Sequence, residues 1–337
     1  MANNITNLGQ QIAIIAGMKD MQGRMSTLQE QISTGVKHQR YSEYGTDALR
    51  ILNYRSDLQS KTAFSDNINI GQINIKQMNT AVEESIKQAT NVLESITKQL
   101  TKGNEFNLES IKGAANTALQ VIQANLNAQV GERYLFAGSD VSNPPYNGSS
   151  TATANIQTEV KNWLDGTTTD TDAFISNVSN LTPSQLGFSL SVQSSKGVSI
   201  RADDNLEVDY TVKATDPGFQ KLIAGLNVLA NLNQPTTGDI PTSDNFYDAV
   251  NRVYQLIKEG TSDLQNSETV LASAASVLDS TLTQHQNDQN SIQKTMDSVE
   301  STDVSAAIVT FQGLQSQLEA SYQLTSILSQ LSLARIL

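Results

Sequence analysis

The stretch VSAAIVTFQGLQSQLEASYQLTSILSQLSLARIL, residues 304–337, decides the fold that we expect for this chain. Its first apolar residues recur at gaps of three or four, which is the spacing of one face of an α-helix. They are Val304, Ile308, Phe311, Leu314, Leu318 and Tyr322. From Leu324 onward, through Leu328 and Leu331, apolar residues spread around the helix, and such a helix needs packing partners on several sides. We therefore expect something outside the helix to cover it.

The N-terminal part of the chain carries a similar seam on a second predicted helix. Its apolar residues alternate at gaps of four and three, which is the pattern of the buried stripe of a coiled coil. They are Ile14, Met18, Met21, Met25, Leu28 and Ile32. Gly35 ends this helix, because glycine readily adopts the left-handed conformation of a C-cap. The methionines also suit a copper-binding stripe, but methionine at this spacing is more often adaptable packing.

Two long helices come next in the prediction. One runs from about Thr46 to Gly103, and the other begins at Asp244 and continues to a break at Ser301. At ~1.5 Å per residue the first would be about 80 Å long, which is typical of coiled coils and fibres. Their seams are Ile75, Met78, Val82, Ile86, Leu93 and Ile96, and Leu271, Leu278, Leu282, Ile292 and Met296. We expect the two helices to pair antiparallel and to form the core of a rod.

Residues 140–245 differ from both arms, because polar residues dominate and helical periodicity fades. Apolar and polar residues alternate from Phe188 to Val192 and from Leu206 to Val212, which predicts two half-buried strands. A helix is predicted from Phe219 to Leu232, and Trp163 is expected in the core of this region. Before the region begins, another helix is predicted from Leu108 to Val130.

These elements predict a mainly α fold with a β-rich insert. Both termini contribute to a long antiparallel helical bundle or coiled-coil rod, and a smaller α+β domain is inserted between them. The expected parts are an N-terminal assembly segment (1–45), the two halves of the rod (46–139 and 246–300), the variable insert (140–245) and a C-terminal assembly helix (301–337).

Composition excludes several classes of function. The 337 residues carry a net charge of −12 without basic clusters, which argues against a nucleic-acid partner. The sequence has no cysteine, so disulfides, thiolate chemistry and Cys-ligated zinc are excluded. No apolar run approaches the ~18 residues of a membrane span, and the N-terminus lacks the basic region of a signal peptide. We expect either a cytoplasmic protein or export without a cleaved signal, and no insertion into a membrane.

The sequence contains few residues that could form a catalytic or metal site. The two histidines are His38 and His285, and His285 occupies a seam position, where packing is a better explanation than catalysis or metal binding. Asp203 and Asp204 lie in a predicted turn, with Asp209 nearby, but a calcium loop needs more oxygen ligands at set spacing. Phosphate-binding glycine loops and a serine nucleophile elbow are absent from the sequence. We predict no enzyme activity, no metal and no cofactor.

Three segments resemble the flagellin-like family of bacterial flagellar proteins. LQEQISTGVK (28–37) resembles the segment after the family's first helix, and LEASYQLTSILSQLSLARIL (318–337) is similar to its terminal helix. GERYLFAGSDVSNPPY (131–146) resembles a motif of the hook-associated proteins at the hook–filament junction. The run HQRYSEYGTDALRIL (38–52) departs from the family's usual Ser-Asp-Asp-Pro-like sequence, so the first connection is not fixed by the resemblance.

The resemblance implies a structural, non-enzymatic adaptor that joins hook to filament. It further implies export through the flagellar type III apparatus, an export chaperone on the C-terminal helix, and self-assembly into a ring. The ring's neighbours would be another hook-associated protein and flagellin. The terminal helices would be disordered in the monomer and form coiled coils on assembly.

Two alternatives stay open from the sequence. The chain could be a filament-forming flagellin, although an Arg-rich receptor-recognition helix is not evident in residues 114–130. It could instead be a surface-exposed flagellin homologue that binds a ligand or polysaccharide, with Tyr146, Trp163 and Tyr210 of the insert stacking on sugars. Scattered aromatic residues are more often core residues, which favours the structural hypothesis.

Overall fold

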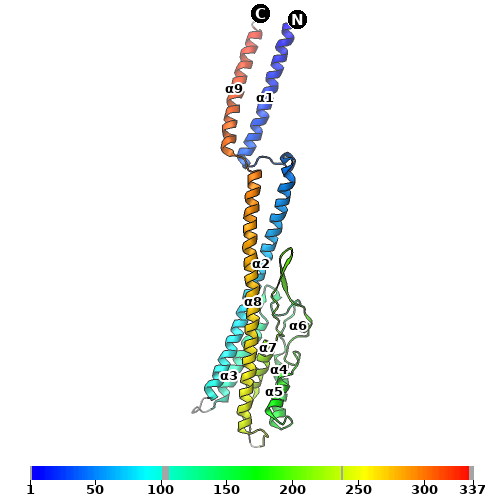
Figure 1. Ribbon diagram of the computed structural model, residues 1–337, viewed down its shortest axis with the longest axis vertical. Coiled ribbons are helices and arrows are strands. Elements are labelled where there is room, and N and C mark those ends of the chain that lie inside the picture. Colours follow the sequence, from blue (N-terminus) through cyan, green and yellow to red (C-terminus); the bar gives the residue numbers. More distant parts are fainter. Residues whose placement is uncertain (1, 101–105, 237, 334–337) are drawn as a thin grey trace. The chain divides into compact units, whose positions relative to one another are not determined.

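The computed structural model describes residues 2–100, 106–236 and 238–333 and is mainly helical, with two small antiparallel sheets (Figure 1). The predicted fold class, mainly α with a small β component, is confirmed. In chain order the elements are α1 (Ala2–Thr34), η1 (Tyr41–Tyr44), α2 (Asp47–Leu100), α3 (Leu108–Leu126), β1 (Gln129–Val130), β2 (Arg133–Tyr134), α4 (Ser149–Leu164), α5 (Thr171–Ser179), α6 (Leu190–Ser194), β3 (Ser199–Asp203), β4 (Leu206–Asp209), α7 (Pro217–Asn231), α8 (Ser243–Glu300) and α9 (Val304–Leu333).

The chain divides into two compact units, and the long helices α2 and α8 contribute to both. One unit comprises residues 1–62 and 287–337, and the other comprises residues 63–286. The first unit therefore holds α1, η1, α9 and one end of each long helix. The second holds the remaining helices, both sheets and the rest of α2 and α8.

Helices α2 and α8 run antiparallel within each unit. In the first unit Arg55 of α2 pairs with Glu300 of α8 at 2.9 Å, and Lys61 pairs with Asp288 at 3.7 Å. In the second unit the ring of Phe64 in α2 lies 5.9 Å from that of His285 in α8, and a Cβ built on Gly71 would lie 3.6 Å from Cδ1 of Leu278. Residue numbers thus rise along one helix as they fall along the other, as the matched seams predict.

The core of the second unit is a bundle of α2, α3, α7 and α8. Helix α7 is apolar on most sides and is buried along most of its length. It approaches α8 closely, because Gly218 and Gly225 bring its backbone against Leu264 and Ile257. On the other side of the bundle, the Asn125 side chain of α3 donates to Oγ of Ser85 in α2 at 3.1 Å. The glycines and short polar contacts set the close spacing of these helices.

Helices α4 and α5 pack on α7 and extend the same core. Trp163 of α4 is buried, as predicted, and stacks on Phe174 of α5 with ring centroids 5.1 Å apart. One connected cluster of buried apolar residues includes these side chains and those of α2, α3, α7 and α8. The region 140–245 therefore shares its core with the bundle, and it contains more helix than the sequence pattern predicts.

Two local predictions are wrong. The alternation from Phe188 to Val192 does not form a strand: residues 190–194 form the short helix α6, since the side chain of Ser189 caps it by accepting from the Val192 amide. The helix predicted from Leu108 to Val130 ends at Leu126, and Val130 lies in the hairpin β1–β2. The predicted strand from Leu206 is present as β4, which pairs antiparallel with β3.

Candidate assembly surface

The first unit contains an antiparallel pair of helices, α1 and α9, which lie side by side (Figure 1). The predicted N-terminal seam lies on one face of α1, and each of its residues is half-buried. They are Ile14, Met18, Met21, Met25, Leu28 and Ile32. Nε2 of Gln22 in α1 donates to the Tyr322 hydroxyl of α9 at 2.9 Å, which adds one polar contact to this pair.

The apolar residues predicted to form one stripe on α9 lie on two different faces of the helix. Phe311 and Leu318 are half-buried and Leu314 is buried, on the same face as the buried Ala307. Those four residues continue the four-three spacing that fits against α1. Val304, Ile308 and Tyr322 are exposed, because they lie beside this seam rather than in it. The side chains of Leu328 and Leu331 lie outside the described residues.

Large apolar side chains remain exposed on both helices of the pair. Ile12 and Ile15 of α1 are each more than half exposed, and Val309, Leu324 and Ile327 of α9 are 69%, 58% and 52% exposed. Monomeric proteins expose single apolar residues commonly, but a series of them on two paired helices marks an interaction surface. We call the exposed apolar residues of α1 and α9 the outer face of the pair.

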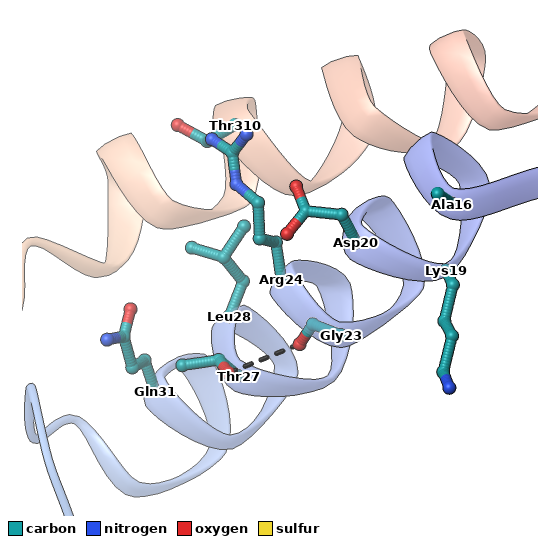
Figure 2. A pocket seen from close by; sticks show the side chains of 9 residues that line it. All are labelled: Ala16, Lys19, Asp20, Gly23, Arg24, Thr27, Leu28, Gln31 and Thr310. Atoms are coloured by element: carbon teal, nitrogen blue, oxygen red, sulfur yellow. Dashed lines mark hydrogen bonds between the residues drawn. The ribbon is translucent and has the colours of Figure 1, made fainter. Parts of the chain in front are cut away.

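An open groove of about 700 Å³ runs along α1 beside α9 (Figure 2). Its lining residues are Ala16, Lys19, Asp20, Gly23, Arg24, Thr27, Leu28, Gln31 and Thr310. Figure 2 shows the side chains of Arg24 and Leu28 directed toward α9. Ala16 and Gly23 have small or no side chains and so leave room in the groove, and the Thr27 hydroxyl donates to the Gly23 carbonyl at 3.2 Å. The groove suits an elongated surface better than a small molecule.

Backbone hydrogen bonds join the segment that connects α1 to α2 with the segment that connects α8 to α9. Val36 and Ser301 form an isolated antiparallel bridge. The Thr302 amide donates to the Gly35 carbonyl at 2.9 Å, and the Lys37 amide donates to the Glu300 carbonyl at 2.8 Å. Gly35 adopts a φ of 73°, the left-handed C-cap that its sequence position predicts. The two connections therefore form one joint at the base of the α1–α9 pair.

Side chains strengthen this joint. The Arg55 guanidinium binds both carboxylate oxygens of Glu300, at 2.9 and 3.1 Å, and donates to the Tyr41 hydroxyl at 2.6 Å. Both carboxylate contacts come from Nη2, and Nη1 makes the contact with Tyr41, so the guanidinium links two groups of the joint through charge-assisted hydrogen bonds. Asp303 then caps the N-terminus of α9 by accepting from the Ala306 amide at 3.0 Å.

The predicted rod seams occupy the interfaces of the long helices. Ile75, Met78, Val82, Ile96, Leu271, Leu278 and Met296 are buried. Ile86, Leu93, Leu282 and Ile292 are half-buried. Their assignment as the core of a rod stays a prediction.

The residues considered for chemistry are scattered. His38 stacks edge-on against Tyr44 in the joint, and His285 is buried in the other unit with Nε2 2.7 Å from the Ala202 carbonyl. Asp203, Asp204 and Asp209 belong to the hairpin β3–β4 or its turn. Among the described residues, no three His, Cys, Asp or Glu side chains lie close enough to hold a metal ion.

The aromatic residues considered for sugar binding do not form an exposed surface. Tyr146, Trp163 and Tyr210 are 3%, 2% and 6% exposed, because each packs into the core of the second unit. That part of the polysaccharide-binding hypothesis is therefore wrong.

Sequence reasoning missed Ala307 and the Arg55–Glu300 pair. Ala307 could have been found by extending the four-three spacing of Phe311, Leu314 and Leu318 backward by one step. Arg55 and Glu300 are 245 positions apart, and no local pattern indicates that they meet.

Comparisons with known proteins identify the fold. No protein-family model and no curated protein sequence matches the chain. A solved structure from Vibrio parahaemolyticus, of a protein provisionally assigned as a flagellar hook-associated protein, has a similar fold with a TM-score of 0.53. The two sequences are 11% identical, and the similarity covers 75% of this chain and 97% of that one. Within the described part of the chain, every helix is too short or too polar to span a bilayer.

Proposed function

We propose that this protein is a structural subunit of the bacterial flagellum, a hook-associated protein of the FlgL type that joins the hook to the filament. The observation that carries the proposal is the outer face of α1 and α9. It exposes large apolar side chains on two helices that bury only a narrow seam between them. Exposed apolar surface of this kind is typical of a site where other subunits bind.

Two independent similarities support the flagellar part of the proposal. Segments 28–37, 131–146 and 318–337 resemble motifs of the flagellin-like family in the same order along the chain. The fold resembles that of the Vibrio parahaemolyticus protein over most of both chains. The described residues hold no cluster of metal-binding side chains, and the groove beside α1 lacks a nucleophile paired with a base, so a structural role suits them better than catalysis.

The partners follow from the surface that each would cover. Copies of this chain would form a ring in which α1 and α9 of neighbouring subunits pack together through their outer faces. A second hook-associated protein and flagellin would bind above and below the ring. Before assembly, an export chaperone would cover α9, and the chain would leave the cell through the flagellar type III apparatus without losing a signal peptide.

Immunogold electron microscopy tests the position of the protein in the flagellum. A hook–filament adaptor predicts gold label at one point, where the filament meets the hook. A filament-forming flagellin, which is the main alternative, predicts label along the whole filament. Label on the cell body with unlabelled flagella would contradict both.

A gene deletion supplies the functional readout. Cells without the adaptor should keep their hooks, lose their filaments and release unassembled flagellin into the medium. Restoring the wild-type gene should restore filaments, whereas a gene encoding Leu324→Asp and Ile327→Asp in the outer face should not. Normal filaments in the deletion strain would rule out the adaptor role.

A further inference from the structure

The hairpin β3–β4 packs against both long helices, α2 and α8, in the second unit. Ile200 and Ala202 of β3 are buried, whereas Ser199 and Arg201, which alternate with them along the strand, are exposed. The hairpin thus turns one face toward α2 and α8. Three contacts in the second unit hold the hairpin against these two helices.

The first contact is a notch in α2. Gly71 is buried in the middle of this helix, where glycine is normally unfavourable relative to alanine. A Cβ at this position would lie 1.9 Å from Cδ1 and 2.9 Å from Cγ1 of Ile200, and 3.6 Å from Cδ1 of Leu278 in α8. Gly71 therefore leaves the space in which Ile200 sits against α2, next to Leu278 of α8.

The second contact is a hydrogen bond to α8. The register of β3–β4 shifts between Arg201 and Asp203, so Ala202 has no partner in the ladder. A bulge of this kind redirects the backbone groups of its residue. Nε2 of the fully buried His285 lies 2.7 Å from the Ala202 carbonyl oxygen, and Nδ1 has no partner among the described residues. Since a carbonyl can only accept, the imidazole carries its proton on Nε2.

The third contact stacks aromatic and charged groups between the same elements. The imidazole of His285 lies against the ring of Phe64 in α2, with centroids 5.9 Å apart and planes 24° from parallel. The Arg201 guanidinium lies 5.8 Å from the centroid of the same Phe64 ring. Residues of α2, α8 and the hairpin therefore meet in one cluster, which we define as Phe64, Gly71, Ile200, Ala202 and His285.

We infer that the hairpin β3–β4 is a register lock for the antiparallel pair α2–α8. Antiparallel helices with repeating apolar seams can slide by a heptad, because each shifted register buries similar side chains. The cluster can form in one register only, since Ile200 must meet Gly71 while Ala202 meets His285. A hairpin that merely rests on the helices would leave their pairing unchanged when it detaches.

Hydrogen exchange on the full-length chain tests this lock. The variants are Gly71→Ala, which fills the notch, and Ile200→Ala, which empties it. The control is Gly113→Ala in α3, where an added Cβ meets nothing within 4 Å. We expect both lock variants to exchange at least tenfold faster than wild type in the hairpin and also in residues 64–78 and 271–285. The control should match wild type in these residues, because alanine at position 113 favours only its own helix, α3.

Two results would overturn the inference. Faster exchange confined to the hairpin would show that it is a passenger. Unchanged exchange in both lock variants would show that the cluster does not hold the hairpin. A second measurement uses the variants His285→Gln and His285→Leu. Glutamine can donate to the Ala202 carbonyl and should retain more of the protection from exchange than leucine. Equal loss of protection in both variants would show that this hydrogen bond does not contribute to the lock.

Discussion

Helices α7 and α9 are both rich in apolar residues, yet the chain buries one and exposes much of the other. In α7, Phe219, Leu222 and Leu226 are fully buried, because α3, α4, α5 and α8 surround the helix. In α9, Val309 and Ile327 are more than half exposed, because α1 covers a single face. The number of neighbours, rather than apolar content, decides how much of each helix is buried within one chain.

This difference separates stability from assembly. Burying a Leu or Ile side chain contributes roughly 1.5–3 kcal/mol, so α7 stabilises the fold of the monomer directly. The exposed side chains of α9 can make the same contribution only after a partner covers them. Isolated helices gain most of their stability from packing, so the α1–α9 pair should open more easily than the bundle.

The largest expected effect comes from placing a charge in each helix. Leu226→Asp buries an unpaired carboxylate in α7 and should lower the free energy of unfolding by about 4 kcal/mol or more. Leu324→Asp places a carboxylate at an exposed position of α9 and should change the free energy of unfolding by less than about 0.5 kcal/mol. Urea unfolding followed by circular dichroism measures both. Equal losses would mean that α9 is packed as tightly as α7.

A glycine-to-alanine pair should give effects of opposite sign. In Gly225→Ala the new Cβ would lie 2.7 Å from Cγ1 of Ile257, so overpacking in α7 should destabilise the fold by about 1–3 kcal/mol. Gly313→Ala in α9 meets nothing within 4 Å and should stabilise its helix by up to about 1 kcal/mol. Thermal melts of the two variants provide the comparison, and a destabilised Gly313→Ala would show a neighbour on that side of α9.

The joint at the base of the pair should have a smaller effect. Glu300→Gln removes the charge from the ion pair with Arg55, whose side chain is half exposed, so we expect a loss of about 1 kcal/mol or less in the free energy of unfolding. A double-mutant cycle with Arg55→Gln isolates the interaction between the two side chains. A coupling energy of zero would show that only the backbone hydrogen bonds, and not the Arg55–Glu300 contact, stabilise the joint.

The smallest effect should appear only in alkaline solution. Burial raises the pKa of Tyr146 in the second unit from 10.0 to about 12. The native state therefore keeps its proton where the unfolded state loses it, so stability is unchanged below pH 10 and falls as the pH rises toward 12. Tyr146→Phe should remove roughly 1 kcal/mol of this loss at pH 11. Urea titrations at pH 8 and pH 11 measure it; an equal decline in both proteins would assign the alkaline loss to other groups.

Periodic patterns allowed much of the fold to be predicted, and the exceptions have physical causes. The seams of α1, α2 and α8 repeat every three or four residues, so their helices and half-buried faces follow from local spacing. Residues 188–192 mimic a strand, but the cap at Ser189 and the surrounding core favour a turn of helix there. The outer face of α9 could be expected from its apolar excess. The notch at Gly71 and the Arg55–Glu300 pair depend on tertiary contacts and leave no local pattern.

Hydrogen exchange on the verified monomer and on assembled flagellar material tests most directly whether α1 and α9 form the assembly surface. We predict that backbone amides of residues 308–331 exchange at least a hundredfold faster than those of residues 219–229 in the monomer. The same amides should become protected on assembly, when neighbouring subunits cover the outer face. Strong protection of residues 318–331 in the monomer, unchanged on assembly, would contradict the account.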